Sequence, residues 1–112
     1  MSEWFVVANS FAAPFFSDTS EDYVEGETAR DALKLFMEGY KHPFGLFAAV
    51  VYESADDYHK GRAPAARWTS NKAVAVEKIV KERGAVLFDE SGPDGFIADG
   101  VRYDIPKGGK FT

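Results

Sequence analysis

The sequence contains no cysteine, only two histidines and only four leucines among its 112 residues. Without cysteine, disulfides, thiolate nucleophiles and cysteine-ligated zinc or iron–sulfur centres are excluded. Ten phenylalanines stand against the four leucines, whereas a helical bundle or coiled coil would be rich in leucine. The composition therefore favours a protein that contains a sheet and has an aromatic core.

Long hydrophobic runs are also missing. The longest one covers residues 46–52, well short of the roughly 20 apolar residues that cross a membrane. The first residues, Met1 to Trp4, are acidic and lack the positive region of a signal peptide. We therefore expect a cytoplasmic protein with no membrane association. The net charge of −5 also argues against nonspecific binding to nucleic acid.

No established catalytic or cofactor motif is present. The chain has no phosphate-cradling glycine pattern, no GxSxG and no HExxH. His42 and His59 lie in different segments, and a zinc site would need both of them together with carboxylates. We expect no cofactor, no metal and no catalytic residue, so the protein is predicted not to be an enzyme.

The hydrophobic pattern predicts one α+β domain over residues 1–112. We expect a sandwich in which a mixed, mostly antiparallel sheet of five to six strands carries two main helices on one face. The predicted order is β-β-α-β-(short α)-α-β-β-β, ending in a β-meander. The clearest strands before the final hairpin cover residues 3–8, 22–25, 44–52 and 85–89, residues 62–69 read as a connection, and residues 106–112 read as a flexible tail.

Capping and turn residues predict where the elements begin and end. Thr28, Ser54 and Ser70 or Asn71 precede three helical patterns, as N-cap residues do. Gly84 is placed to end the last helix. Asp99-Gly100 predicts a two-residue hairpin that pairs residues 98 with 101 and 96 with 103. The buried stripes are expected at positions 29, 32, 33, 36, 37 and 40 of the first helix and at 73, 76, 79 and 80 of the last.

An aromatic cluster lies in the predicted loop of residues 9–19. Phe11, Phe15 and Phe16 are unusual in a solvated loop. They either fold back over the core or form an exposed patch that binds a partner or a second copy of the chain. Loops of this length are often functional, so these three phenylalanines are the candidate partner-binding residues.

The segment 60–72 is basic within an acidic chain. Arg62, Arg67 and Trp68 lie on a connection that leads to a helix N-terminus, which suggests a site for an anion or a nucleotide phosphate. The alternative is that the cations are the solvated surface of the following helix and that Trp68 is a half-buried anchor.

Asp56 and His59 are three positions apart on the short predicted helix. A carboxylate that orients an imidazole is an arrangement for general-base catalysis. The same residues also read as a short solvated helix with acids at its start and bases at its end, which the helix dipole favours.

Acidic residues dominate the first part of the chain. Residues 1–31 contain seven acids and one base. The acids at positions 18, 21, 22, 25 and 27 could mimic nucleic-acid phosphates or bind a basic protein surface. They could equally be a solvated edge strand whose charges prevent sheet-to-sheet aggregation.

The leading functional hypothesis is a non-enzymatic protein-interaction module that acts on a protein partner or as a homodimer. A small acidic regulator or inhibitor, of the kind that mobile elements encode, fits this description. The first alternative is a domain that binds a small molecule, anion or nucleotide through the basic segment 60–72. The second is a small enzyme with Asp56 and His59 as its general-base pair.

Overall fold

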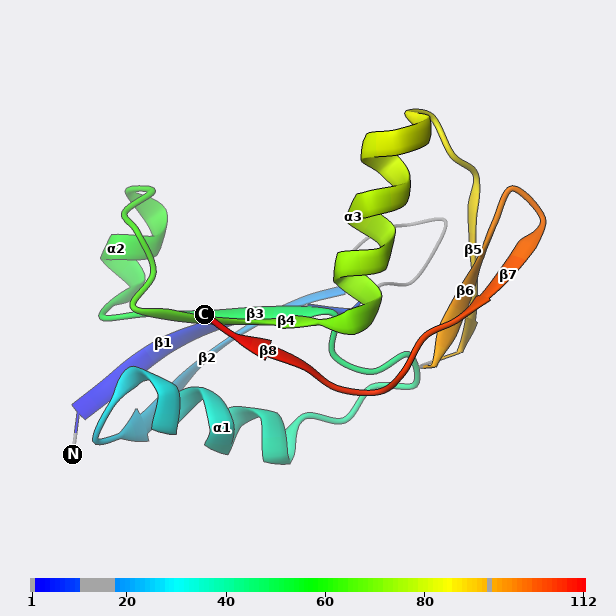
Figure 1. Cartoon of the computed structure of the whole chain (residues 1–112). Helices are drawn as coiled ribbons and strands as arrows, with labels where there is room; N and C mark the ends of the chain where they lie inside the picture. Colours follow the sequence, from blue (N-terminus) through cyan, green and yellow to red (C-terminus); the bar gives the residue numbers. More distant parts are fainter. Residues whose placement is uncertain (1, 11–17, 93) are drawn as a thin grey trace.

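The computed structural model describes residues 2–10, 18–92 and 94–112. The elements are β1 (Ser2–Ser10), β2 (Asp18–Gly26), α1 (Ala29–Gly39), β3 (Ala48–Tyr52), α2 (Ala55–His59), β4 (Ala66–Ser70), α3 (Asn71–Arg83), β5 (Phe88–Gly92), β6 (Gly95–Ala98), β7 (Val101–Asp104) and β8 (Gly109–Phe111). The protein has the predicted α+β class (Figure 1).

The strands form two sheets rather than the single one expected. A five-stranded sheet has the order β2-β1-β3-β4-β8, and a three-stranded sheet has the order β5-β6-β7. Every pairing is antiparallel. The three-stranded sheet corresponds to the predicted meander, but its first strand is Phe88–Gly92 instead of residues 85–89, and it is separate from the other strands.

Two strands lie where the sequence predicts none. Residues 66–69, expected in a connection, form β4 together with Ser70, between β3 and β8. Residues 109–111, expected in a flexible tail, form β8. Phe111 pairs with Trp68 in the β4–β8 register and packs against the core beneath α1. The packing of the partly buried Phe111 against the core that contains Trp68 holds the chain end on the sheet.

The three helices begin at the predicted caps. The hydroxyl oxygens of Thr28, Ser54 and Ser70 accept hydrogen bonds from the backbone N–H three residues later, at 3.0–3.1 Å. The Asp99-Gly100 turn is also confirmed, with φ of 49° and 80° at its two residues and the predicted partners across β6 and β7. Two positive φ values are those of a type I′ hairpin.

The buried side chains of each long helix pack on a different sheet (Figure 1). Leu33 of α1 packs against Val6, Val51 and other residues of the five-stranded sheet. Val76 and Ile79 of α3 instead pack against Phe88 and Phe96 of the three-stranded sheet. The expected arrangement, with both helices on one face of one sheet, is therefore replaced by two helix-on-sheet units. Val80, expected in the buried stripe, is exposed.

Candidate functional site

The predicted partner-binding residues Phe11, Phe15 and Phe16 lie outside the described residues. Their role stays a prediction. The remaining candidate residues are described, and the structure separates most of them.

The structure does not bring together the three residues of the predicted anion site, Arg62, Arg67 and Trp68. The Arg62 Nη1 donates to Asp57 Oδ1 at 2.9 Å, at the end of α2. Arg67 and Trp68 are neighbours on β4, so their side chains point to opposite faces of the sheet. Trp68 is buried in the core beneath α1, whereas Arg67 is exposed. The three side chains therefore do not form one anion cradle.

Asp56 and His59 are also separate in their contacts. Asp56 Oδ2 forms an exposed ion pair with Lys60 Nζ at 3.0 Å. His59 is exposed, and its ring lies 5.1 Å from that of Tyr58. Within the part of the chain that the structure describes, no hydrogen bond joins Asp56 to His59. The acidic residues of α2 lie at the start of the helix and the basic residues at its end, which is the distribution that the helix dipole favours.

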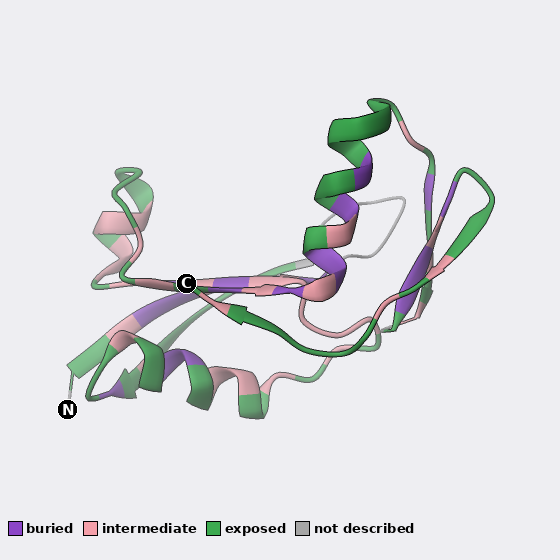
Figure 2. Ribbon diagram, in the orientation of Figure 1, coloured by how far each residue is buried: buried purple, intermediate pink, exposed green. Residues whose placement is uncertain are grey.

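The acidic stretch forms an open edge of the five-stranded sheet. β2 is the outermost strand and pairs along all nine residues with β1. Glu21, Asp22 and Glu25 lie on it and are exposed, so that most of β2 is green in Figure 2 while β1 is largely buried at its centre. We call these three residues the acidic edge. No cation among the described residues forms a salt bridge with any of them.

Two carboxylates face each other across this edge. Glu25 on β2 is the direct register partner of Glu3 on β1, and both side chains are exposed. Like charges directly opposite on neighbouring strands are destabilising. The acidic edge therefore costs folding stability at this position instead of contributing to it.

A groove runs beside the acidic edge, between β2 and α1. Its volume is 520 Å³, and Val24, Leu35, Phe36 and Tyr40 supply its apolar lining. Leu35 in the groove and Tyr23 beside it are both 55% exposed. The groove thus combines an apolar floor with a rim that contains the three acids of β2 and Lys41.

The Tyr23 ring lies on the face of the sheet that bears α2, opposite to the groove, and is held there by aromatic packing. It packs against Phe5 with ring centroids 5.1 Å apart, and Phe5 in turn contacts Tyr58 of α2 at 5.7 Å. Tyr58 also contacts Tyr52 of β3 at 5.3 Å. An aromatic ring fixed by such packing loses little rotamer freedom when it contacts a partner.

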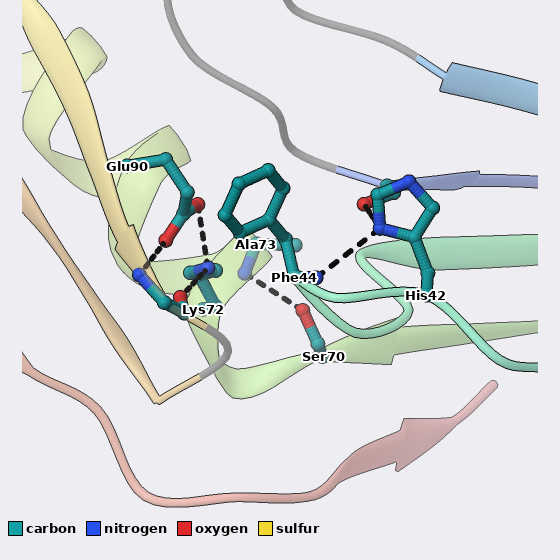
Figure 3. A network of polar contacts seen from close by, with 8 residues as sticks. His42, Phe44, Ser70, Lys72, Ala73 and Glu90 are labelled. Carbon is teal, nitrogen blue, oxygen red and sulfur yellow. Dashed lines mark hydrogen bonds and ion pairs between the residues drawn. The ribbon is translucent and has the colours of Figure 1, made fainter.

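A second hollow lies where the two sheets meet. This junction cleft has a volume of 290 Å³ and is lined by Trp68, Ser70 and Lys72 as well as by residues of the 40–46 and 105–108 loops. Lys72 Nζ contacts Glu90 Oε2 at 2.6 Å and the Gly92 carbonyl at 2.8 Å (Figure 3). The cleft therefore contains a buried ion pair that sequence reasoning missed.

His42 also lines the junction cleft and makes a separate set of hydrogen bonds (Figure 3). Its Nδ1 accepts from the Phe44 backbone N–H at 3.2 Å and lies 2.9 Å from the hydroxyl of Ser10. Ser10 is fully buried at the end of β1. The contacts join the loop before β3 to the sheet, which is a structural role for this histidine.

Neither a metal cluster nor a membrane span is found in the described ranges. No group of three or more histidine, aspartate or glutamate side chains there could hold a metal ion. No helix there is both long enough and apolar enough to span a bilayer.

No protein-family model, curated protein or solved structure matches this chain. The functional argument therefore rests on the residues of the chain itself.

Proposed function

We propose that this chain is a non-enzymatic, cytoplasmic protein-interaction module, a small acidic regulator or inhibitor that binds a basic protein through its acidic edge. The observation that carries the proposal is the open edge of β2, where exposed carboxylates without described cation partners border an apolar groove. Interfaces combine an apolar centre with a charged rim, and charge complementarity selects the partner.

Three further observations support a basic protein as the partner. The acids on the open edge would repel nucleic-acid phosphates. They would also repel the same edge of a second copy, so a symmetric dimer through β2 is disfavoured. The opposing pair Glu3 and Glu25 costs stability that a cation on the partner would offset.

The proposal is tested by affinity capture from a native lysate of the source cells. The bait is used as wild type, as a Glu21→Lys/Glu25→Lys double variant, and as a control with Glu77→Lys/Glu82→Lys. The control changes the charge equally on α3, far from the groove. Lysine is well tolerated on an edge strand, so the first variant is expected to fold.

We expect a protein with a basic surface to be retained by the wild type and the α3 control and to be lost with the β2 variant. Its capture should also weaken as salt is raised, because the carboxylates are exposed. Equal capture by all three baits, or no specific capture by the wild type, would count against the proposal.

A second candidate function is binding of a small molecule at the junction cleft. Trp68 and Lys72, from the basic segment, line this cleft of 290 Å³, although Arg62 and Arg67 are not among its lining residues. The cleft is near the small end of ligand sites, roughly 300 Å³. A rise in melting temperature with nucleotides or phosphorylated metabolites would support this function, and no shift across a broad panel would remove it.

A further inference from the structure

The backbone of β2 offers an unpaired edge as well as charges. Its nine residues pair with β1 in one continuous register, from Ser2 with Gly26 to Ser10 with Asp18. In the described residues no strand pairs with its other side. Every second N–H and C=O of an edge strand points away from its neighbour, so an outer edge of this kind is a template for one more strand.

The other edges in the described residues are poorer templates. β8 has three residues, and β7 has four. The register of β5 shifts between Asp89 and Gly92. β2 is therefore the one long, regular edge in the part of the chain that the structure describes.

The side chains beside this edge specify what an added strand would carry. Glu21, Tyr23 and Glu25 alternate onto the face that bears α2, because Tyr23 is opposite Phe5. Leu35 and Phe36 of α1 line the groove on the other face. Successive side chains of a strand point to opposite faces. Cations on one face would meet the carboxylates, and apolar side chains on the other would enter the groove.

We propose that the partner binds by strand addition: an extended segment with alternating basic and apolar residues pairs with the outer edge of β2. This inference rests on the proposed function and gives it a binding mode, in which main-chain hydrogen bonds supply affinity and alternate side chains supply specificity. A second copy of the chain is not the occupant. If β2 paired with β2 of a second copy, the acids of the two strands would repel each other, and β8 is too short to pair along β2.

The test uses the full chain and a nine-residue peptide of alternating lysine and valine with blocked ends. The control peptide has the same sequence but is methylated at every backbone nitrogen. It keeps the charges and side chains but cannot donate main-chain hydrogen bonds. Binding is followed by NMR titration and by amide hydrogen exchange of β2.

We expect the unmethylated peptide to bind at least tenfold more tightly than the methylated one. Bound peptide should slow exchange at least tenfold at every second amide of β2, because those N–H groups gain acceptors. The NMR signals of Leu35 and Phe36 should shift in the same titration, because both side chains line the groove. The Glu21→Lys/Glu25→Lys variant should lose binding, and Glu77→Lys/Glu82→Lys should retain it.

Equal binding of the two peptides, or no binding of either, would overturn strand addition. A chain that sediments as a dimer and becomes monomeric in the Glu21→Lys/Glu25→Lys variant would also overturn it, since a second copy would then occupy the edge. None of these results decides the affinity-capture test, which asks only whether the carboxylates select a protein.

Discussion

At the scale of single residues, charge is placed in two opposite ways. Lys72 and Glu90 are an ion pair with side chains only 6% and 1% exposed, and Glu90 Oε1 also accepts from the Gly92 N–H at 3.0 Å. Glu21, Asp22 and Glu25 on β2 are exposed and form no ion pair with the described residues, and Asp22 Oδ1 accepts only a local hydrogen bond from the Tyr23 N–H at 2.9 Å. The buried pair joins α3 to β5, whereas the exposed acids join no two elements of the described fold. Because of this contrast, we assign a structural role to the Lys72–Glu90 pair and a binding role to the acids of β2.

The buried pair leads to a prediction about stability. Glu90→Leu alone leaves the Lys72 charge buried without its carboxylate and should lower the free energy of unfolding by about 3–5 kcal/mol. Lys72→Met together with Glu90→Leu removes both charges and should restore most of that loss. Urea unfolding of the three proteins measures the difference. A double variant as unstable as the single one would contradict this description of the pair.

The opposing carboxylates lead to a second prediction. Glu25→Gln removes the repulsion with Glu3 and should raise the free energy of unfolding by about 0.2–1 kcal/mol, while weakening partner capture. Glu21→Gln is the matched control, because Glu21 is opposite Val7 and meets no like charge there. It should weaken capture without the gain in stability. If both substitutions change stability equally, the repulsion between Glu3 and Glu25 is not significant.

At the scale of elements, short-range chemistry made much of the fold predictable from the sequence. The caps at Thr28, Ser54 and Ser70 and the Asp99-Gly100 turn depend on residues within a few positions of one another. β4 and β8 were missed because neither has an apolar alternation of its own. Their pairing brings together Trp68, which is buried, and Phe111, which is partly buried against the same core, across 43 positions of sequence, and no local pattern contains such a contact.

The docking of β8 leads to a prediction at this scale. A Cβ on Gly109 would come within 2.6 Å of Cζ2 of the Trp68 ring and would also contact the Thr69 carbonyl. Gly109→Ala should therefore destabilise the protein by about 1–3 kcal/mol, the usual cost of overpacking. Gly39→Ala on α1 is the control, since a Cβ there meets nothing within 4 Å. Thermal unfolding that is unaffected by Gly109→Ala would contradict the packing of β8 on β4.

At the scale of the whole molecule, charge is distributed across the five-stranded sheet. The acidic edge lies on β2 at one side, and Arg67 and Lys110 lie on β4 and β8 at the other. The acidic stretch is visible in the sequence, and a basic protein surface is one of the targets that its charge predicts. The sequence could not place the groove, because Val24 of β2 and Leu35 of α1 line one hollow only when α1 folds back beside β2. The Lys72–Glu90 pair was unpredictable for the same reason.

The most direct measurement of the central claim is the dissociation constant of the captured partner for the purified chain. Calorimetry at fixed salt compares the wild type, Glu21→Lys/Glu25→Lys and Glu77→Lys/Glu82→Lys. We predict an affinity at least tenfold weaker for the β2 variant, a loss of about 1.4 kcal/mol or more, and an unchanged affinity for the α3 control. An unchanged affinity for the folded β2 variant would contradict the assignment of the acidic edge as the binding surface.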